Sequence, residues 1–505
     1  MRGLSRHRLA DTARELGETV KLHHIALWLA LGAAPLGAQG VRITGTTTVD
    51  YVDVQPLVID SVLASSTSDS GLLRTTPDGI IVECAGADPY CRYYRSASRV
   101  STGPLMQDLE LSGWGLGTGI SIYAQGRVRT SIGNASEIWP FADDHFDLLA
   151  AYAELQRSRW RVRLGRQWAA SALGYYAYDG GSVRAAPIPG LSAELYGGWG
   201  LAQGWIGTRT SSAIAAVEDL PPDDRGYIVG ATLGYRLATR GGLSVQYQRE
   251  IRTDRAALYS ERMAAAADLR VGLARIDARA TYDLAAGEFN DAYLRAQRPL
   301  GRQWNVSGEV RHHLPFFELW TIWGAFSPVG YNEGRVTAAW GTRDGQVQID
   351  GSASYRRYAE TNAGVGFLPL RNDGWTVGAD GSWRVAPAWT ALGGYHIGVG
   401  YGASRSDFDA GIRWQQRERV WLGVNGSAFQ TIEEFSVGEG RVLGLAVDGG
   451  ARLTADTRIS ADLALYHHTE RGAPQRANWN QRRASVQLSW TIGRDPGMAE
   501  RGERR

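Results

Sequence analysis

The stretch RASVQLSWTIG, from Arg483 to Gly493, constrains the fold of this chain more than any other feature. Every second residue from Ala484 to Ile492 is apolar, and every residue between them is polar. Successive side chains of a β-strand leave the backbone on opposite faces, so this alternation predicts a strand whose two faces meet different surroundings.

The same alternation recurs with little interruption from residue 41 to 493, for example at 41–51, 120–129, 275–283, 346–355 and 375–384. We count about 22 such segments, each near the ~10 residues that a tilted strand needs to cross a bilayer. No amphipathic helix lies between them to cover the apolar faces, and stripes of Ala, Gly, Val and Trp fill a soluble β-sandwich poorly. The pattern therefore predicts an all-β fold, a transmembrane antiparallel up-and-down barrel of about 22 strands, with 18–24 allowed because one missed hairpin changes the count by two.

The connections between these segments alternate in length, which is typical of outer-membrane barrels. An even number of strands would place both ends of the barrel on the short-turn, periplasmic side. The predicted short turns are 157–159, 239–242, 301–303, 343–345, 386–387, 417–418 and 455–456. The predicted long connections are 56–104, 132–145, 203–225, 315–331, 360–372 and 469–478.

Six tryptophans stand beside short turns. Three of them begin segments and three end them, where an aromatic girdle belongs at the edge of the lipid. These residues are Trp160, Trp304, Trp389, Trp340, Trp383 and Trp414. The apolar faces of the strands are therefore expected to meet lipid, and the polar faces a water-filled lumen.

Over about 41–493 the sequence resembles the bacterial outer-membrane β-barrel family, in its porin-like branch. The segments AYAEL (151–155) and RLGRQ (163–167), followed by Asp179 and Gly180, look like a recurrent stretch of substrate-selective and polysaccharide-export porins. The resemblance implies a location in the bacterial outer membrane. The chain departs from the family at its end, where a charged tail (494–505) replaces the usual terminal aromatic residue.

The N-terminus predicts export. The basic stretch Lys21–His24 precedes ten apolar residues, Ile25–Ala34, and the small-residue exit at Ala38, as in a secretory signal peptide. Residues 1–38 are therefore expected to be removed, which leaves the barrel in 39–493. Because residues 1–19 are polar and helix-prone, we expect translation to start at position 20.

N-terminal sequencing tests this expectation. The unprocessed precursor should begin at position 20, and the mature chain should begin at Gln39 because the small Ala38 suits the residue before a cleavage site. A precursor that begins at Met1 would contradict the first part of the prediction.

The long connection 56–104 contains both cysteines of the chain, Cys84 and Cys91. In an exported chain these two predict a disulfide, and closing so small a loop would contribute roughly 2–3 kcal/mol in the chain-entropy model. We interpret the loop as a stapled cap that folds over or into the pore. The candidate residues for a constriction by this loop are Arg92, Tyr93, Tyr94 and Arg95. The alternative is that the loop is an exposed surface loop.

The polar face of the predicted barrel carries charges of both signs. Without residues 1–38 the chain has 49 basic (54 less 5) and 49 acidic (52 less 3) residues, so no global field attracts nucleic acid. The candidates for lining the channel are Arg127, Arg129, Arg161, Arg163, Arg270, Arg275, Asp277, Arg279, Asp283 and Arg295. Segregated rows of such charges create a path for ions, whereas charges paired across neighbouring strands only satisfy one another.

Catalytic and metal-binding patterns are weak. In the doublets His312-His313 and His467-His468, neighbouring strand residues point to opposite faces and cannot chelate one ion together. The sequence contains no GxSxG, HExxH, phosphate-loop or CxxCH pattern. We therefore expect neither an enzyme nor a bound cofactor.

Two functions fit these observations. The first is a porin-like channel in the outer membrane for passive or substrate-selective passage of small polar or ionic solutes. The second is a barrel sheath or export conduit that houses a periplasmic partner protein, such as an electron-transfer or secretion component. Energy-coupled transport is disfavoured because strand patterning begins at Val41 and leaves no room for an N-terminal plug.

Overall fold

The structure is a computed structural model. It describes residues 40–493 except 55–56, 70–73, 78–79, 81, 85–88, 97, 134–144, 202–225, 253–257, 315–329, 360–371, 401–402, 417–418, 435–439 and 471–477. The predicted signal peptide and the charged tail lie outside the described residues.

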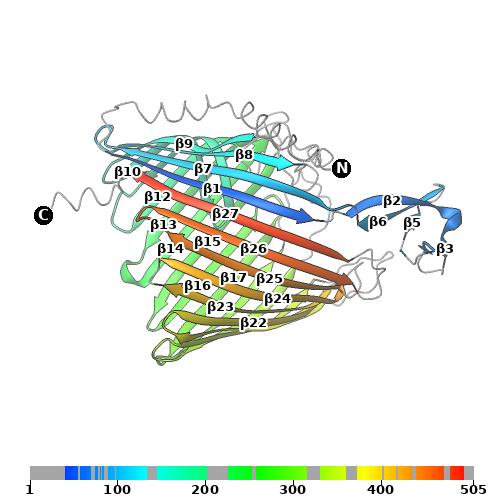
Figure 1. The fold of residues 1–505 in the computed structure, drawn as a ribbon. Helices are drawn as coiled ribbons and strands as arrows, with labels where there is room; N and C mark the ends of the chain where they lie inside the picture. Colours follow the sequence, from blue (N-terminus) through cyan, green and yellow to red (C-terminus); the bar gives the residue numbers. More distant parts are fainter. Residues whose placement is uncertain are drawn as a thin grey trace.

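The described residues form a closed antiparallel barrel of 22 strands, which confirms the predicted fold class (Figure 1). The first strand, β1, pairs with β7 on one side and with the last strand, β27, on the other, so that no edge is left open. The strands in chain order are β1 (Gly40–Val54), β7 (Val100–Trp114), β8 (Ile120–Gly133), β9 (His145–Gln156), β10 (Trp160–Ser171), β11 (Gly174–Ala185), β12 (Leu191–Gly200), β13 (Gly226–Arg236), β14 (Gly241–Arg252), β15 (Leu258–Val271), β16 (Ala274–Asp283), β17 (Glu288–Leu300), β18 (Trp304–His313), β19 (Tyr331–Gly341), β20 (Val347–Tyr358), β21 (Asp373–Ala386), β22 (Trp389–Gly400), β23 (Ala403–Gln416), β24 (Val420–Glu434), β25 (Gly440–Arg452), β26 (Thr457–Glu470) and β27 (Trp479–Gly493).

The alternating pattern separates the two faces of the wall. In β27 the exposed Val486 and Ile492 stand opposite Val49 and Ile43 of β1, so the apolar sets of the two strands share one face. The same face carries Leu294 of β17, which is exposed as well. A broad apolar exterior on a closed barrel is what a bilayer requires, because lipid cannot hydrogen-bond an unpaired backbone.

The two rims differ as predicted. Short turns such as 301–303 and 453–456 join strands at one rim, and both β1 and β27 have their free ends there, since Arg42 pairs with Gly493. A short helical turn, η5 (Ala238–Arg240), lies at the same rim. Aromatic pairs mark both rims: Trp304 and Trp340 lie near the short turns, and Trp199 packs on Tyr227 near the long loops, with ring centroids 4.4 Å apart.

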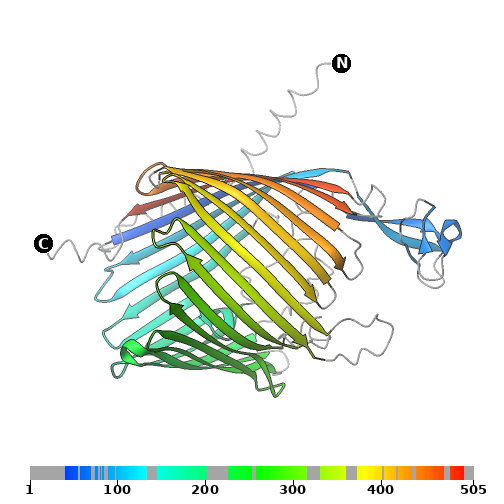
Figure 2. The ribbon, with the colours of Figure 1, turned by 90° about the horizontal axis from the view of Figure 1, so that it is seen from below.

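The long connection between β1 and β7 forms an arm that continues away from the barrel (Figures 1 and 2). Strand β2 (Leu57–Leu63) pairs with β6 (Tyr90–Ser96), which also pairs with β5 (Glu83–Cys84). The predicted disulfide Cys84–Cys91 joins β5 to β6. A short helical turn, η1 (Ala64–Ser66), and the two-residue strands β3 (Ser68–Asp69) and β4 (Arg74–Thr75) complete the arm.

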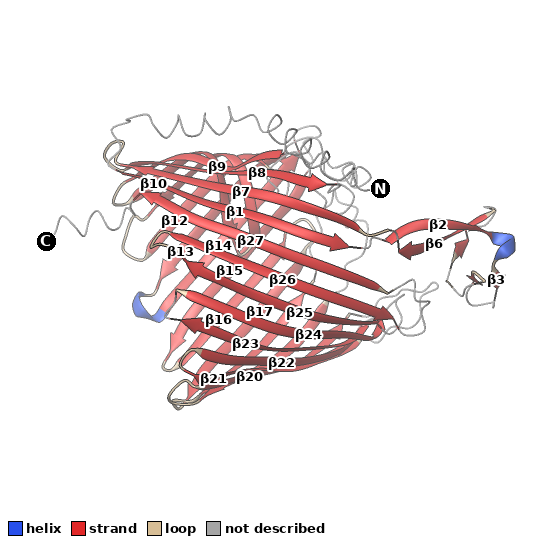
Figure 3. Cartoon of the chain, viewed as in Figure 1, coloured by secondary structure: helices blue, strands red, loops and turns tan. Residues whose placement is uncertain are grey.

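This placement does not support the proposed constriction by the arm. Arg92, Tyr93, Tyr94 and Arg95 all belong to β6, which lies beyond the rim of the barrel and not in its lumen (Figure 3). The β1–β7 ladder ends at Val54 and Val100, and a separate ladder between β2 and β6 begins at Leu57 and Ser96. The physical reason is that β2 and β6 satisfy their backbone hydrogen bonds by pairing with each other, so they need no partner in the barrel wall.

Within the part of the chain that the structure describes, no helix is long and apolar enough to cross a membrane.

Two neighbouring substitutions in β27 test the assignment of faces. Val486→Arg places a charge on the lipid side near the middle of the strand, and we expect it to lower the free energy of unfolding in lipid vesicles by about 2–4 kcal/mol. Gln487→Arg, one residue further on, points into the lumen and should cost far less. Equal losses in a denaturant titration of the two variants would contradict the assignment.

Candidate functional site

The polar face of the barrel wall holds all ten residues proposed to line the channel. Strand register places each on the face opposite the exposed apolar side chains: Arg127 and Arg129 on β8, Arg161 and Arg163 on β10, Arg270 on β15, Arg275, Asp277, Arg279 and Asp283 on β16, and Arg295 on β17. Asp283 has a local role, because its Oδ1 accepts hydrogen bonds from the backbone N–H groups of Ala285 and Ala286 at 2.8 and 3.0 Å.

Charges on β7 to β12 are paired across neighbouring strands. Arg127 contacts Asp108 at 2.7 Å, and Arg129 contacts Asp147 at 2.8 Å. The carboxylate of Glu154 lies 2.5 Å from Arg163 and 3.8 Å from Arg161. On this wall the charges are paired across neighbouring strands and do not form segregated rows of one sign.

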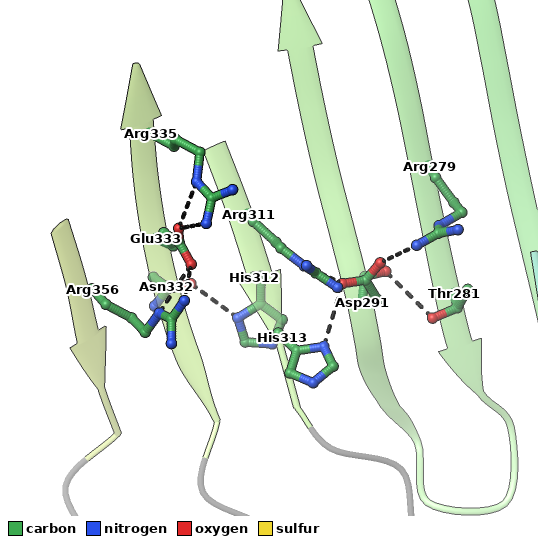
Figure 4. Close-up of polar contacts among 10 residues, drawn as sticks. All are labelled: Arg279, Thr281, Asp291, Arg311, His312, His313, Asn332, Glu333, Arg335 and Arg356. Atoms are coloured by element: carbon green, nitrogen blue, oxygen red, sulfur yellow. Dashed lines mark hydrogen bonds and ion pairs between the residues drawn. The ribbon is translucent and has the colours of Figure 1, made fainter. Parts of the chain in front are cut away.

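The wall from β16 to β20 differs because two buried carboxylates each receive two guanidinium groups (Figure 4). Asp291 on β17 contacts Arg279 at 2.9 Å and Arg311 at 2.7 Å. The ring of His313 lies 3.4 Å from the same carboxylate. Around Asp291, two arginine side chains therefore surround one carboxylate.

The second carboxylate, Glu333 on β19, repeats the arrangement one strand pair further along the wall. Its oxygens lie 2.9 Å from Arg335 and 2.8 Å from Arg356. Together the two groups bring four guanidinium groups around two carboxylates, which is a local excess of positive charge. Glu309, which faces the lumen on the strand between them, reduces this excess without cancelling it. Such a surface attracts anions into a water-filled lumen.

The histidine doublets divide between the two faces, as the sequence predicted. His312 lies on the outer face and its ring contacts Asn332 at 2.9 Å, while the ring of His313 turns into the lumen toward Asp291 (Figure 4). The described residues contain no group of three side chains suited to hold a metal ion.

The hairpin of β10 and β11 leaves the wall partway along its length. Strand β10 pairs with β9 only from Arg161 to Arg166, although β10 continues to Ser171. On the other side, the pairing of β11 with β12 stops at Tyr178. In the remaining tip, residues 167–177, β10 and β11 form ladder pairs only with each other, and Ala177 accepts one further backbone hydrogen bond from the N–H of Leu201 at 2.8 Å.

This hairpin tip folds across the inner face of the neighbouring strands. Tyr178 stacks on Tyr196 of β12 with ring centroids 5.5 Å apart. Further along, the backbone N–H of Ala172 donates to Oε1 of Gln246 on β14 at 2.8 Å. The guanidinium of Arg262 on β15 lies 5.7 Å from the ring of Tyr176. A hairpin that remained in the wall could not reach strands three and four places away.

Burial of the inner wall agrees with this fold. Ile228 on β13 and Gln248 on β14 both face the lumen, yet each is only 1% exposed. Ser260 on β15 is buried as well. Lumen-facing side chains of an open barrel would meet water, so a covering element is required, and the hairpin tip makes its contacts in this region.

Glycines allow the hairpin to bend. Gly165 has φ +127°, a conformation that L side chains rarely adopt, and a Cβ there would lie 2.2 Å from the carbonyl oxygen of Ala151. Gly180 and Gly198 face each other on β11 and β12, where a Cβ on Gly198 would lie 2.7 Å from the Cα of Gly180. Side chains at these positions would hold the strands apart.

Three polar side chains hold the bend. Arg166 binds Asp179 through two hydrogen bonds, at 2.7 and 2.9 Å, and donates a third to the carbonyl oxygen of Leu148 at 3.0 Å. Gln167 is buried; its Nε2 donates to the carbonyl oxygen of Gly180, and its Oε1 accepts from the hydroxyl of Ser182. The bond to Leu148 satisfies a carbonyl on β9 at the level where β10 departs.

The sequence showed RLGRQ and Asp179-Gly180 as a resemblance but did not indicate that they form the base of a hairpin that leaves the wall. One signal was available. The turn between β10 and β11 at the long-loop rim has only two residues, Ala172 and Leu173, and it precedes the aromatic run Tyr175-Tyr176-Ala177-Tyr178. Reasoning from sequence also missed His396 on the lumen wall, which lies 3.2 Å from Asp380 and 3.1 Å from Asp407.

Comparison with known proteins gives structural likeness only. No family model matches the chain, and no curated protein matches it. The chain is similar to OccAB4 of Acinetobacter baumannii, with 9% identity, TM-score 0.37, and coverage of 91% of this chain and 100% of that one. It is similar to the outer membrane protein OpdK of Pseudomonas aeruginosa, with 12% identity, TM-score 0.37, and coverage of 90% of this chain and 99% of that one. It is also similar to the siderophore receptor PirA of the same organism, with 8% identity, TM-score 0.45, and coverage of 89% of this chain and 80% of that one. No functional assignment follows from similarities at this level.

The chain's own architecture defines its class. A closed, even-numbered antiparallel barrel with an apolar exterior, two aromatic rims, and short turns opposite long loops is an outer-membrane β-barrel. Its place is the bacterial outer membrane.

Cysteine accessibility tests the folded-in hairpin. Ile228→Cys and Leu392→Cys both place a thiol on the lumen face, but only position 228 lies where the hairpin covers the wall. We expect a membrane-impermeant thiosulfonate to modify Cys at 392 at least tenfold faster, because a buried thiol is inaccessible. Similar rates at the two positions would show that the hairpin does not cover the wall.

Proposed function

We propose that this protein is a substrate-selective channel for small polar solutes in the bacterial outer membrane, and that the β10–β11 hairpin forms its constriction. The inward fold of residues 167–178 over β12 to β15 is the observation that carries this proposal. The fold and wall chemistry favour transport over catalysis.

The size of the barrel explains why a constriction is needed. Barrels of 16–18 strands already leave an aqueous channel, and 22-stranded barrels commonly have an obstructed lumen. An open barrel of this circumference would pass solutes without selecting among them. A hairpin laid across one side of the lumen narrows the path and adds side chains that contact the solute.

The charged walls fit a path for polar solutes. The four arginines around Asp291 and Glu333 give one wall an excess of positive charge. Carboxylates stand directly opposite one another on another part of the lumen wall, where Asp448 of β25 faces Asp462 of β26 and Arg413 lies 3.5 Å from Asp448. Separate clusters of opposite charge create a local transverse field, which orients a dipolar solute as it passes.

Single-channel conductance of the refolded mature protein in a planar bilayer tests the proposal. The complete barrel should conduct steadily. A variant in which Asn-Gly replaces residues 168–177 should conduct distinctly more, because the obstruction is removed while the base of the hairpin remains. A folded but electrically silent barrel would overturn the channel and favour the conduit that houses a partner protein.

The arm offers a matched control. Replacing residues 57–96 by a short turn removes a segment of greater length, but one that lies beyond the rim. We expect this variant to keep the conductance of the complete protein. If trimming the arm raised conductance and trimming the hairpin did not, the arm and not the hairpin would form the constriction.

A further inference from the structure

We propose that the lumen face of the β10–β11 hairpin is a binding site for the ring of a neutral sugar. This inference rests on the proposed channel and names the class of solute that the channel selects. The site consists of Trp168 and Tyr175 as the aromatic surface, with Arg166 and Asp179 as its polar edge.

The four side chains share one face of the hairpin. Arg166 and Asp179 stand at its base, where the hairpin is still paired with β9 and β12, and Trp168 and Tyr175 stand on the tip beyond it. Strand register pairs Arg166 with Asp179, and Trp168 with the small Ala177. Tyr175 stands opposite Ala170 on the same face, and its ring stacks on Trp168 with centroids 5.5 Å apart and planes inclined by 28°. The opposite face of the hairpin, with Gln167 and Tyr178, is the one that packs on the barrel wall.

The aromatic surface is open although it does not face lipid. Trp168 and Tyr175 are each 45% exposed, whereas Tyr178 on the packed face is only 2% exposed. Other exposed aromatic residues such as Trp199 lie on the outer wall, where lipid covers them. Aromatic rings held open to the water of a lumen lose hydrophobic stabilisation, so a surface of this kind suggests a ligand.

A second aromatic pair lies on the neighbouring wall. Tyr123 of β8 and Tyr152 of β9 both face the lumen and stack with centroids 5.2 Å apart. The guanidinium of Arg163 covers the ring of Tyr152 at 4.9 Å. Tyr175 lies within electrostatic range of Tyr123. The hairpin and this wall therefore present aromatic groups to the same part of the lumen.

The polar groups around this space suit hydroxyl groups better than a charged ligand. Arg166 and Asp179 form a bidentate pair, which offers donors and acceptors side by side without net charge. Arg163 on β10 itself and Arg127 on β8 also have carboxylate partners. An anion would find the arginine excess on the wall near Asp291 and Glu333 more favourable.

A pyranose ring meets both requirements. Its C–H groups form an apolar face that can lie on an indole or phenol ring, and its hydroxyl groups both donate and accept hydrogen bonds. An aromatic carboxylate would use the same rings but would need an unpaired cation. The combination of open rings with neutral ion pairs therefore points to sugars.

Current interruption by maltotriose, a neutral trisaccharide of glucose, is the first test. In the complete protein maltotriose should interrupt the single-channel current, and Trp168→Ala should shorten the residence time roughly tenfold, since one aromatic contact is lost. Tyr175→Ala should act in the same direction, and Trp168→Phe should retain most of the effect. Trp199→Ala, which removes a lipid-facing tryptophan, is the matched control and should change nothing.

A calorimetric titration of the detergent-solubilised barrel with maltotriose gives a readout that does not depend on conductance. Heat of binding that disappears in Trp168→Ala supports the site even if the barrel is electrically silent, in which case only the proposed channel fails. A barrel that conducts but neither binds maltotriose nor is interrupted by it would overturn the sugar site and leave the channel. Interruption by 4-hydroxybenzoate but not by maltotriose would also overturn it, in favour of aromatic anions.

Discussion

The ladder between the first and last strands is the interaction on which the rest of the structure depends. It runs from Arg42 paired with Gly493 to Asp53 paired with Arg482, and it joins segments more than 400 residues apart in the chain. Without it, β1 and β27 would each present a row of unpaired N–H and C=O groups to hydrocarbon, at a cost of several kcal/mol per group. Closure allows a chain of modest mean hydropathy to span a membrane. Only every second side chain of each strand faces lipid, so only every second one must be apolar.

Once the wall is closed, any element that enters the lumen must come out of the wall and leave polar backbone behind. The β10–β11 hairpin does so at a defined position. Gly165 adopts the positive φ that the bend requires. The guanidinium of Arg166 donates a hydrogen bond to the carbonyl oxygen of Leu148, at the level where β9 is no longer paired with β10. Asp179 keeps that guanidinium neutralised. The departure of the hairpin and the repair of the wall thus depend on residues that adjoin each other in sequence.

Sequence reasoning predicted the barrel well because side-chain parity is a local property of a strand. The number of strands, the two kinds of rim and the disulfide Cys84–Cys91 are all confirmed. It did not predict the inward hairpin, because parity does not report when a hairpin departs from the wall. Counted along β10, Trp168 falls on the same face as the outward Leu164, and only the fold of the tip turns that face toward the lumen. The long loop 56–104 was interpreted as a cap, yet its strands β2 and β6 pair with each other beyond the rim.

A charged residue at a position that parity assigns to lipid therefore indicates where a strand leaves the wall. The length of a loop does not indicate this. An arginine facing hydrocarbon costs roughly 2–4 kcal/mol near the middle of the membrane, so RLGRQ contains a conflict if β10 is straight. The conflict is resolved because Arg166 is neutralised by Asp179 and donates to the carbonyl oxygen of Leu148, and because the strand leaves the wall directly after it. The same bend places the stacked rings of Trp168 and Tyr175 beside this ion pair. A departure from strict alternation of polar and apolar residues thus identifies the segment of the barrel whose outward-parity side chains do not face lipid.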